Sequence, residues 1–368
     1  MRHKIFVGLS GGVDSAVSAA LLQSQGYDVV GAFIKIWQPE FLECTWAADR
    51  LDAMRVCATL GIPFREIDLS NEYKKEVVER MVNDYARGVT PNPDVLCNSR
   101  IKFGSFATWA KAEGAHGIAT GHYARKREVG GHVELTRARD ISKDQSYFLY
   151  RLGQLDLART MFPVGGMLKS EVRALAQKFN LPVAKKHDSQ GLCFVGEVSM
   201  AEFLKRFIAV FPGAVLCEGK VVGEHEGAAL YTIGQRHGFA LQQGHAEERP
   251  ERVQRVEGST PYYVTGTDVA QNRVYVSARR EDAERPSAIL SEVHWVYREP
   301  KMPYKVQVQA RYHEQGVGAT LTKDEGGFVA TFEHPHIASP GQSLVFYEPA
   351  GKPEEADVCL GGGILQNV

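Results

Sequence analysis

Short apolar runs alternate with segments of helical periodicity over roughly the first half of the chain. The runs KIFVGL, DVVGAFIKIW and PFREIDL are rich in β-branched and aromatic residues, and helices are expected after them over 16–25, 47–60 and 72–87. This rhythm is typical of parallel sheets built from βα units. A helix over 101–112 and a strand in GIATGHYA continue the series. The pattern predicts an α/β domain with a doubly wound parallel sheet.

Several motifs fall at the carboxyl ends of these predicted strands. SGGVDS (residues 10–15) follows the first strand, Ile34 lies late in the second, and GHYA closes the strand that ends this series. Ligands of doubly wound sheets bind beyond the carboxyl ends of the strands. We therefore expect these segments to face one crevice.

The pattern changes in the second half of the chain. Helices are expected over 169–179 and 200–207, and beyond Pro212 short strands separated by glycine predict a small β-rich central domain. From about Arg280 the apolar residues alternate with period two between turn residues, which is typical of a small closed β-structure. The predicted domains are 1–205, 206–278 and a C-terminal β-barrel over 279–368. The polar stretch GHAEERPERVQRVEGSTP is expected to be a loop.

Composition narrows the possible functions. Hydrophobic residues make up 44% and charged residues 24% of the 368 residues, and no uncharged apolar run is long enough to cross a bilayer. The N-terminus is interpreted as the first core strand of a cytoplasmic protein. A net charge of -1 gives no global attraction to nucleic acid. RNA binding would need local basic clusters, for which 125–127, 137–139 and 185–186 are candidates, although each could equally be a solvated face.

The cysteines exclude two common kinds of site. The six cysteines contain no CxxC pair, so neither a disulfide framework nor a zinc site is indicated. Sulfur chemistry, if present, must therefore use single thiols.

The motif SGGVDS has the context of an anion-binding loop. It follows a strand and opens a helix, where glycines let an anion approach the backbone while free N–H groups and the helix dipole neutralise it. It lacks the lysine of a Walker A loop, which disfavours transfer of a γ-phosphate. The alternative is a tight turn in which Asp14 or Ser15 caps the helix. The candidate nucleotide-binding residues are Gly8, Leu9, Ser10, Gly11, Gly12, Val13, Asp14 and Ser15.

This loop resembles that of the PP-loop ATP pyrophosphatases. The resemblance implies that the loop embraces the pyrophosphate of ATP, which is split between its α and β phosphates to leave an adenylated substrate. It therefore implies ATP as cofactor. Mg²⁺ is expected because expulsion of pyrophosphate requires charge neutralisation, but no dedicated protein cage is visible, and Asp14 is the nearest candidate ligand.

Further motifs narrow the resemblance. NPDVLCNSRIKF (92–103), ATGHYA (119–124), KDQSYFLY (143–150) and DSQGLCF (188–194), with TIGQRHG, ARY and SPGQS later, closely resemble the bacterial tRNA-specific 2-thiouridylases over nearly the full length. The family substrate is the wobble uridine, position 34, of certain tRNAs, whose C2 oxygen is replaced by sulfur. That oxygen is a poor leaving group, so transfer of AMP to it prepares its displacement by a persulfide.

The resemblance assigns roles to two thiols. Cys193 would carry the persulfide, and Cys97 would attack that sulfur pair and leave the terminal sulfur on the base. A disulfide between Cys97 and Cys193 would result, and an external thiol would reduce it. Cys97 also lies near the start of a predicted helix, which favours a thiolate; without the resemblance both would be interpreted as ordinary buried cysteines. The other four are left as structural: Cys44, Cys57, Cys217 and Cys359.

The remaining site residues also follow from the resemblance. Asp94 is expected to act as acid or base toward the base edge, or to cap the helix. Base contacts are expected from Asn92, Pro93 and Asp94, and nucleotide contacts from Gly121 and Ile34, where the family usually has Met. Contacts with tRNA are expected from His122, Lys143, Asp144, Gln145, Arg311, Tyr312 and Gln342. Other departures from the family pattern are Ser99, Arg100 and Gln190.

The expected partners are the anticodon stem-loop of tRNA and a sulfur-donor protein. Two alternatives stay open. Another adenylating PP-loop enzyme would pass nitrogen to a small molecule and need no pair of thiols. A tRNA-binding module that has lost catalysis would bind RNA without converting ATP to AMP.

Overall fold

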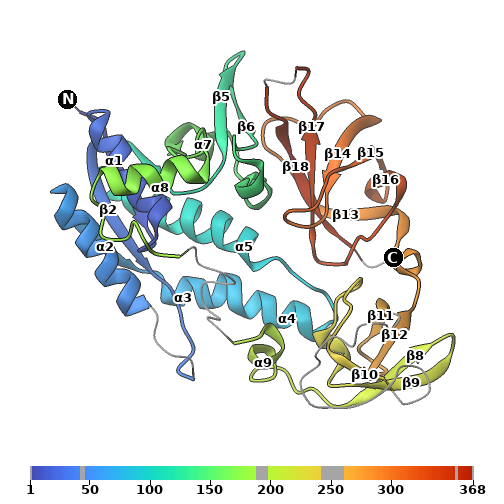
Figure 1. Ribbon diagram of the computed structural model, residues 1–368. Helices are drawn as coiled ribbons and strands as arrows, with labels where there is room; N and C mark the ends of the chain where they lie inside the picture. The colour runs from blue at the N-terminus through green and yellow to red at the C-terminus, as the bar shows by residue number, and fades with distance from the viewer. Residues whose placement is uncertain (1, 42–45, 188–197, 242–260, 353–354, 367–368) are drawn as a thin grey trace.

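Three β-sheets organise the protein. The computed structural model describes residues 2–41, 46–187, 198–241, 261–352 and 355–366. Within them lie a five-stranded parallel sheet, a small five-stranded sheet and an eight-stranded antiparallel sheet (Figure 1). No helix in these ranges is long and apolar enough to cross a membrane.

The first sheet is doubly wound, as predicted. Its strand order is β3-β2-β1-β4-β7, with every pair parallel. The chain moves from β1 outward to β2 and β3 and then crosses back to β4, so the order reverses between β1 and β4. The strands are β1 (Lys4–Leu9), β2 (Asp28–Lys35), β3 (Phe64–Asp68), β4 (Gly117–Ala119) and β7 (Thr160–Met161).

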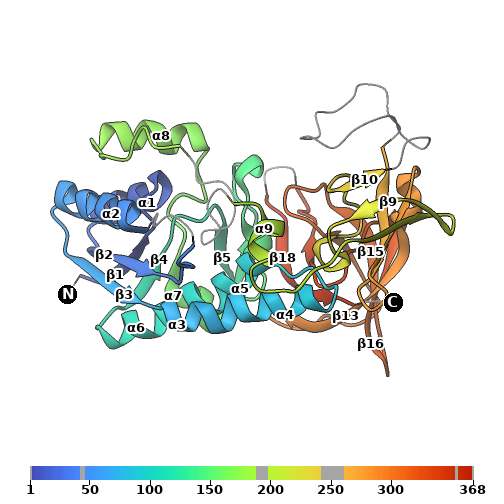
Figure 2. The same cartoon turned by 90° about the horizontal axis from the view of Figure 1, so that it is seen from below.

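Helices cover both faces of this sheet (Figure 2). One face carries α1 (Val13–Ser24), α2 (Trp46–Leu60) and α8 (Lys169–Lys178); the other carries α3 (Ser70–Tyr73), α4 (Arg80–Ala86), α6 (Phe106–Ala112) and α7 (Gln154–Arg159). Successive side chains of β1 point to opposite faces of the sheet. Val7 belongs to the core under α1, and Phe6 to the core on the opposite side. Burial of both faces explains why KIFVGL is apolar without alternation.

The helix expected over 101–112 begins earlier. A short α5 (Pro93–Leu96) continues through a π-helical segment, Cys97–Ser105, into α6. Proline is favoured at the first helical position, and the Asn92 side chain accepts a hydrogen bond from the N–H of Val95, so the PNPD turn starts the helix and does not precede it. A second π-helical segment, Lys74–Glu79, joins α3 to α4.

The central sheet has a core of its own, as predicted. It follows α9 (Met200–Leu204), and its order is β10-β9-β8-β12-β11. Val215, Val222, Tyr231, Val264 and Val274 are buried in it. Its strands are β8 (Gly213–Cys217), β9 (Lys220–His225), β10 (Phe239–Leu241), β11 (Tyr263–Asp268) and β12 (Arg273–Ser277). Most of the expected polar loop lies outside the described residues.

The C-terminal strands close into the predicted barrel. The order β13-β16-β15-β14-β17-β18 is completed by pairing of β18 with β13. The strands are β13 (Arg285–Trp295), β14 (Tyr304–Gln309), β15 (Val317–Asp324), β16 (Gly327–His336), β17 (Ser343–Glu348) and β18 (Val358–Leu365). The glycine-rich β18 was not expected as a strand. A Cβ at Gly361 would lie 2.0 Å from the carbonyl oxygen of His294, so glycine permits the closing contact.

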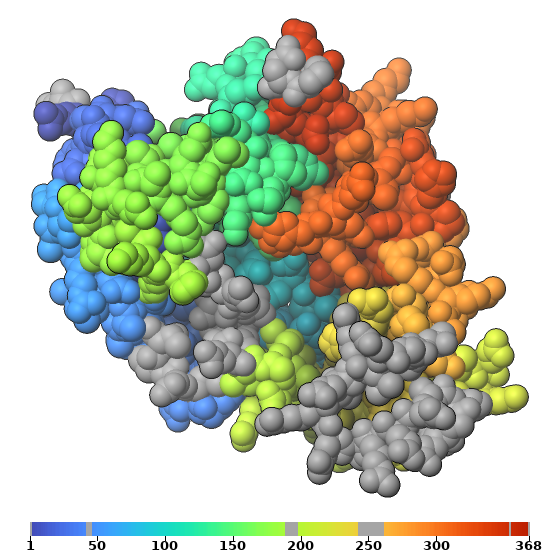
Figure 3. Space-filling model, in the orientation of Figure 1, coloured from blue at the N-terminus to red at the C-terminus, as the bar shows by residue number. Residues whose placement is uncertain are grey.

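One hairpin crosses between the predicted domains. The basic cluster 125–127 lies in β5 (Arg125–Val129), which pairs with β6 (His132–Thr136). Val358 and Cys359 of β18 pair in turn with Thr136 and Leu135 of β6, so this hairpin extends the barrel sheet. The predicted boundaries divide the sequence, but residues 125–136 belong structurally to both parts. In the space-filling view the two parts form a continuous surface (Figure 3).

Candidate active site

The SGGVDS loop lies at the reversal of strand order. β1 ends at Leu9 and α1 begins at Val13, with Gly12 at the N-cap (φ −98°, ψ 169°) and Gly11 at φ +72°. The alternative of Asp14 or Ser15 as N-cap is wrong, because both lie inside the first turn. Glycine has no side chain with which to occupy the first N–H groups of α1, which can therefore bind an anion.

Two serines close the loop. The Ser10 N–H donates to Ser15 Oγ at 3.2 Å, the two hydroxyl oxygens are 3.3 Å apart, and Ser15 Oγ donates to the Gly12 carbonyl oxygen at 3.3 Å. These bonds join the two ends of the loop and hold its shape in advance of a ligand.

Two glycines permit close packing around the loop. A Cβ at Gly11 would lie 2.5 Å from the Asp49 carbonyl oxygen, and a Cβ at Gly121 would lie 2.6 Å from the Ser15 nitrogen. Real Cβ atoms do not approach backbone atoms this closely, so both positions require glycine. The segment after β4 therefore packs directly on the start of α1, as the expected nucleotide contact of Gly121 would require. Ile34, on β2, lies beside Gly8: a Cβ at Gly8 would be 3.9 Å from Ile34 Cδ1.

A lysine distant in sequence reaches the loop. Lys169 Nζ, at the start of α8, lies 2.7 and 2.8 Å from the carboxylate oxygens of Asp14, and the Tyr123 hydroxyl donates to the same carboxylate at 3.0 Å. No motif in the sequence includes Lys169, and Tyr123 was not singled out although it lies within the ATGHYA motif. The absence of a Walker A lysine was the available evidence for a residue such as Lys169, because a phosphate loop without that lysine needs a cation from another part of the chain.

The turn at Asn92 places Asp94 and Cys97 on one short helix. Asn92 caps it, Pro93 is its first residue, and Cys97 follows one turn after Pro93 with 5% of its surface exposed. Burial raises the pKa of Asp94, and the Lys102 ammonium opposes this rise. A carboxyl group with a raised pKa is suited to exchange a proton near neutral pH.

His122 connects this helix with the phosphate loop. It follows Gly121 directly, its Nδ1 lies 2.8 Å from Thr120 Oγ1, and its ring centroid is 5.8 Å from that of Phe103. Burial, with the Lys102 charge, lowers the pKa of His122 well below its usual value, so the imidazole is neutral at pH 7. Contacts thus lead from Ser15 through residues 121 and 122 to the helix that carries Asp94 and Cys97. Lys102 was within a quoted motif but was not singled out from the sequence.

The barrel contributes the next part of the site. Gln342 Nε2 donates to the carbonyl oxygens of Thr90 and Pro91 at 2.8 and 3.2 Å, which fixes the barrel to the turn before Asn92. The Tyr312 ring lies 4.5 Å from that of Phe148. Burial, with smaller effects of the Asp144 and Asp94 charges, raises the pKa of Tyr312 to about 12.

Other predicted tRNA contacts have partners inside the protein. Arg311 Nη2 donates to the Ile233 carbonyl oxygen at 2.7 Å, and Gln145 Oε1 accepts from the Tyr123 N–H at 3.0 Å. The Asp144 carboxylate is buried and faces Arg137, whereas Lys143 is partly exposed. The structure thus brings residues 143–145, 311–312 and 342 toward the Asn92 turn. Their side chains differ in how far they are exposed to a ligand.

Cys193, Gln190 and Cys44 lie outside the described residues, so the expected pairing of Cys97 with Cys193 stays a prediction. Among the cysteines left as structural, burial raises the pKa of Cys57 to about 11 and that of Cys359 to about 12. Both thiols therefore resist conversion to the thiolate, the reactive form. Across the described ranges, no group of three or more His, Cys, Asp or Glu side chains is arranged to hold a metal ion.

Comparisons with known proteins agree with this architecture. Three family models match in succession: a tRNA methyl transferase HUP domain over residues 3–197, a tRNA methyl transferase PRC-barrel domain over 201–278 and an aminomethyltransferase beta-barrel domain over 285–365. Among solved structures, the U34-tRNA thiolase NcsA from Methanococcus maripaludis aligns with 55% of this chain and 62% of its own, at 18% identity and a TM-score of 0.35. A TM-score this low supports no further comparison.

Full-length relatives are much more similar. The tRNA-specific 2-thiouridylase MnmA of Proteus mirabilis (strain HI4320) is 42% identical over 374 residues, covering 99% of this chain and 97% of the relative. The protein of the same name from Janthinobacterium sp. (strain Marseille) is 42% identical over 375 residues, covering 99% and 98%. Identity at this level along the whole chain is more specific than the descriptions of separate domains. The chain belongs to the tRNA-specific 2-thiouridylase family.

Proposed function

We propose that this chain is an ATP-dependent tRNA-uridine 2-sulfurtransferase that converts the wobble uridine, position 34, to 2-thiouridine, with release of AMP and pyrophosphate. The observation that carries the proposal is the series of contacts from the phosphate loop to the helix that begins at Pro93 and carries Cys97. Gly121 packs on Ser15, and its neighbour His122 lies against the helix that bears Asp94 and Cys97. A nucleotide and a nucleobase can meet along this series of contacts.

The phosphate loop would bind the pyrophosphate end of ATP. The N–H groups of the first turn of α1 and the Ser10 and Ser15 hydroxyls are the donors available to it. Mg²⁺ is proposed to neutralise the phosphates, and Asp14 is the residue that would hold it. The carboxylate chemistry of Asp14 fits this ion, and Lys169, which now pairs with Asp14, supplies a second positive charge beside the loop.

Adenylation would occur beside the Asn92 turn. The C2 oxygen of the uridine forms a bond to the α-phosphorus of ATP, and the bond to the β-phosphate oxygen breaks, so pyrophosphate leaves. Asn92, Pro93 and Asp94 are proposed to hold the base, with Asp94 as the acid or base. The neutral His122 lies on the tRNA side and can donate or accept a hydrogen bond without adding charge.

Sulfur transfer would then use both thiols. The terminal sulfur of a Cys193 persulfide attacks C2, and the C2–O bond breaks to release AMP. The Cys97 thiolate attacks the Cys193 sulfur, which leaves sulfur on the base and forms a disulfide. An external thiol supplies two electrons to reduce this disulfide, and a sulfur-donor protein reloads Cys193. The proposed location is the cytoplasm, where the tRNA substrate is found.

The test reconstitutes the reaction with unmodified tRNA, ATP, Mg²⁺, and a cysteine desulfurase with cysteine as the sulfur source. We expect 2-thiouridine and AMP from the wild-type chain, and no 2-thiouridine from C97S or C193S. C217S is the control, because Cys217 lies on β8 of the central sheet and has no role in the proposed reaction. Thiolation without ATP, or undiminished thiolation by C193S, would refute the mechanism. Turnover of a small-molecule acceptor by C97S would favour the other adenylating enzymes.

A further inference from the structure

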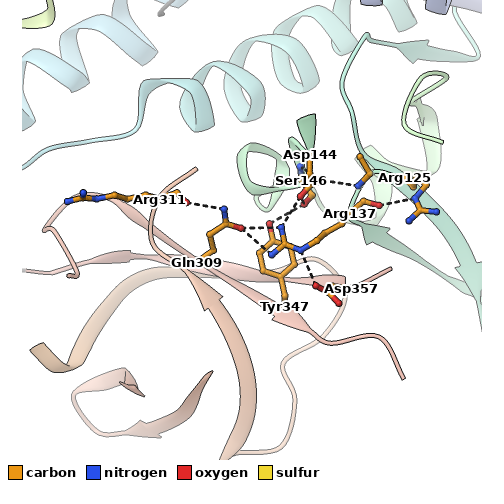
Figure 4. Close-up of polar contacts among 9 residues, drawn as sticks. Arg125, Arg137, Asp144, Ser146, Gln309, Arg311, Tyr347 and Asp357 are labelled. Atoms are coloured by element: carbon orange, nitrogen blue, oxygen red, sulfur yellow. Dashed lines mark hydrogen bonds and ion pairs between the residues drawn. The ribbon is translucent and has the colours of Figure 1, made fainter. Parts of the chain in front are cut away.

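A buried polar cluster joins the α/β domain to the barrel (Figure 4). Arg137, just after β6, lies at its centre. Its Nη1 is 2.9 Å from Asp144 Oδ2, its Nε is 3.1 Å from Asp357 Oδ2, and both Nη atoms lie 3.2 Å from Gln309 Oε1. The guanidinium carbon also lies 3.6 Å from the centre of the Tyr347 ring.

Only arginine can make this set of contacts at once. Its donors form a rigid planar fork, which here reaches two carboxylates and one amide while its flat face stacks on an aromatic ring. A lysine ammonium is a compact point charge, so it cannot reach two carboxylates and an amide at once while also stacking on an aromatic ring. The Arg137 side chain is 13% exposed and that of Asp144 4%, so the charges are shielded from water and depend on each other.

Both ends of the cluster reach residues with predicted tRNA contacts. On one side, Asp144 is the middle residue of 143–145, and its carboxylate also accepts from the Ala138 N–H at 2.8 Å and the Ser146 hydroxyl at 2.8 Å. On the other side, Gln309 Nε2 donates to the carbonyl oxygen of Arg311 at 3.0 Å. Arg137 therefore connects the 143–145 segment to Arg311 through three successive hydrogen bonds: Asp144 to Arg137, Arg137 to Gln309, and Gln309 to Arg311.

We propose that Arg137 is a positioning residue for tRNA binding. It sets the distance between segment 143–145 of the α/β domain and residues 311–312 of the barrel, so that both bind one tRNA as a single surface. The Arg137 side chain is only 13% exposed, so its proposed role is to hold these segments in place and not to contact the RNA itself. The inference rests on the proposed function, since it assumes that these two segments bind tRNA.

The location of the cluster favours positioning over catalysis. The nucleotide loop has its own cation in Lys169, and no contact of Arg137 leads to Ser10, Asp14 or Ser15 within the described ranges. Loss of Arg137 should therefore change tRNA binding much more than ATP binding.

The test compares R137M, R137K and the matched control R159M, in which the same change is made at an exposed arginine at the end of α7. We expect R137M to raise the KM for tRNA about tenfold, as expected for loss of a coupled contact, while the KM for ATP stays within about twofold. R137K should lie between R137M and the wild type, and R159M should match the wild type. A melting curve shows whether each variant is folded.

A double-mutant cycle separates positioning from general damage. If Arg137 acts through Arg311, the loss of tRNA affinity caused by R311A in the wild type should largely disappear in the R137M background. An equal loss in both backgrounds would overturn the proposal. So would a folded R137M with unchanged KM for tRNA, or one in which the KM values for tRNA and ATP rise equally.

A second variant tests the same proposal in case R137M does not fold. Q309L removes the Arg137 contact and the bond to the Arg311 carbonyl oxygen while the pairs with Asp144 and Asp357 remain. We expect a rise of about threefold in the KM for tRNA, and no rise would count against the proposal. A wild-type chain that does not thiolate tRNA would refute the proposed function instead, so the two failures are distinguishable.

Discussion

The phosphate loop and the side of the site that is proposed to face RNA, called the RNA-facing side below, are built in opposite ways. The loop closes on itself through contacts between Ser10 and Ser15, five residues apart. The RNA-facing side depends on bonds such as that from Gln342 to Thr90, across 252 residues, and that from Arg137 to Gln309, across 172. A site made from consecutive residues can be recognised in a sequence, whereas a site assembled from distant segments depends on the fold of the whole chain.

This contrast leads to different expectations for mutation. The loop is closely packed, so a single added methyl group that clashes with its backbone should disable nucleotide binding. The RNA-facing side has many separate contacts, so the loss of one should have a graded effect. Asp94 is the expected exception, because the chemistry on that side is concentrated in one carboxyl group.

The largest effect is expected for D94N, which should lower the rate of thiolation by about 10²- to 10⁴-fold, the usual range for loss of an acid or base. Burial raises the pKa of Asp94, so the wild-type pH profile should show a titration above the range of an ordinary aspartate. The rate rises with pH through this titration if Asp94 is a base and falls if it is an acid. D94N should remove the titration.

Two measurements make this test specific. D68N is the control, because hydrogen bonds from Lys35 and Ser70 lower the pKa of Asp68 to about 2, so its loss should not change the profile above pH 4 or so. A raised folded-state pKa also means that stability falls as pH rises through it, so D94N should not lower Tm at pH 7. A D94N chain with the wild-type rate and pH profile would show that Asp94 has a structural role in the helix and takes no part in the chemistry.

The next largest effect is expected for G121A. A Cβ at this position would lie 2.6 Å from the Ser15 nitrogen and 2.8 Å from the Asp14 carbonyl carbon, so the start of α1 must shift. We expect kcat/KM for ATP to fall by about 10²-fold, as is common when a binding group is displaced by an ångström. G166A is the control, since nothing lies within 4 Å of its new methyl group. Equal activity of G121A and G166A would contradict the close packing of the loop.

A smaller effect is expected for K169M. It removes the cation that lies 2.7 Å from Asp14, in a pair whose side chains are 12% and 30% exposed. We expect the KM for ATP to rise about tenfold, because the loop loses a nearby positive charge that is proposed to stabilise the bound phosphates. K178M, at the exposed end of the same helix, is the control. If K169M instead changed only the KM for tRNA, Lys169 would not act on the nucleotide loop.

The smallest effect is expected for Q342L, which removes two hydrogen bonds to the backbone at Thr90 and Pro91. Each such bond contributes on the order of 1 kcal/mol, so Tm should fall by a few degrees and the KM for tRNA should rise about threefold. Q366L, at an exposed glutamine, should do neither. A loss of tRNA binding as large as the effect of G121A on ATP would show that Gln342 contacts the RNA directly.

The sequence predicted the parallel sheet, the small β-rich part and the barrel because each has its own periodicity. Hairpin β5–β6 and strand β18 were missed for physical reasons. The hairpin carries Arg125, Lys126 and Arg127, which resemble a solvated face, and β18 is rich in glycine because it packs closely on β13. The phosphate loop was recognisable from six consecutive residues. The contacts of Lys169, Tyr123 and Arg137 were not, although Tyr123 lies in the ATGHYA motif and Arg137 in the basic cluster 137–139, because the fold brings their partners from distant parts of the sequence.

The pairing of β18 with β6 has a consequence for how the protein is made. The β6 strand is synthesised long before its neighbour Val358–Leu365. Until then the hairpin has an unpaired edge, which is open to other strands, and Arg137 lacks its partner at Asp357. Chains that stop before β18 should therefore aggregate or be degraded, and the surface proposed to bind tRNA can form only after β18 has been made.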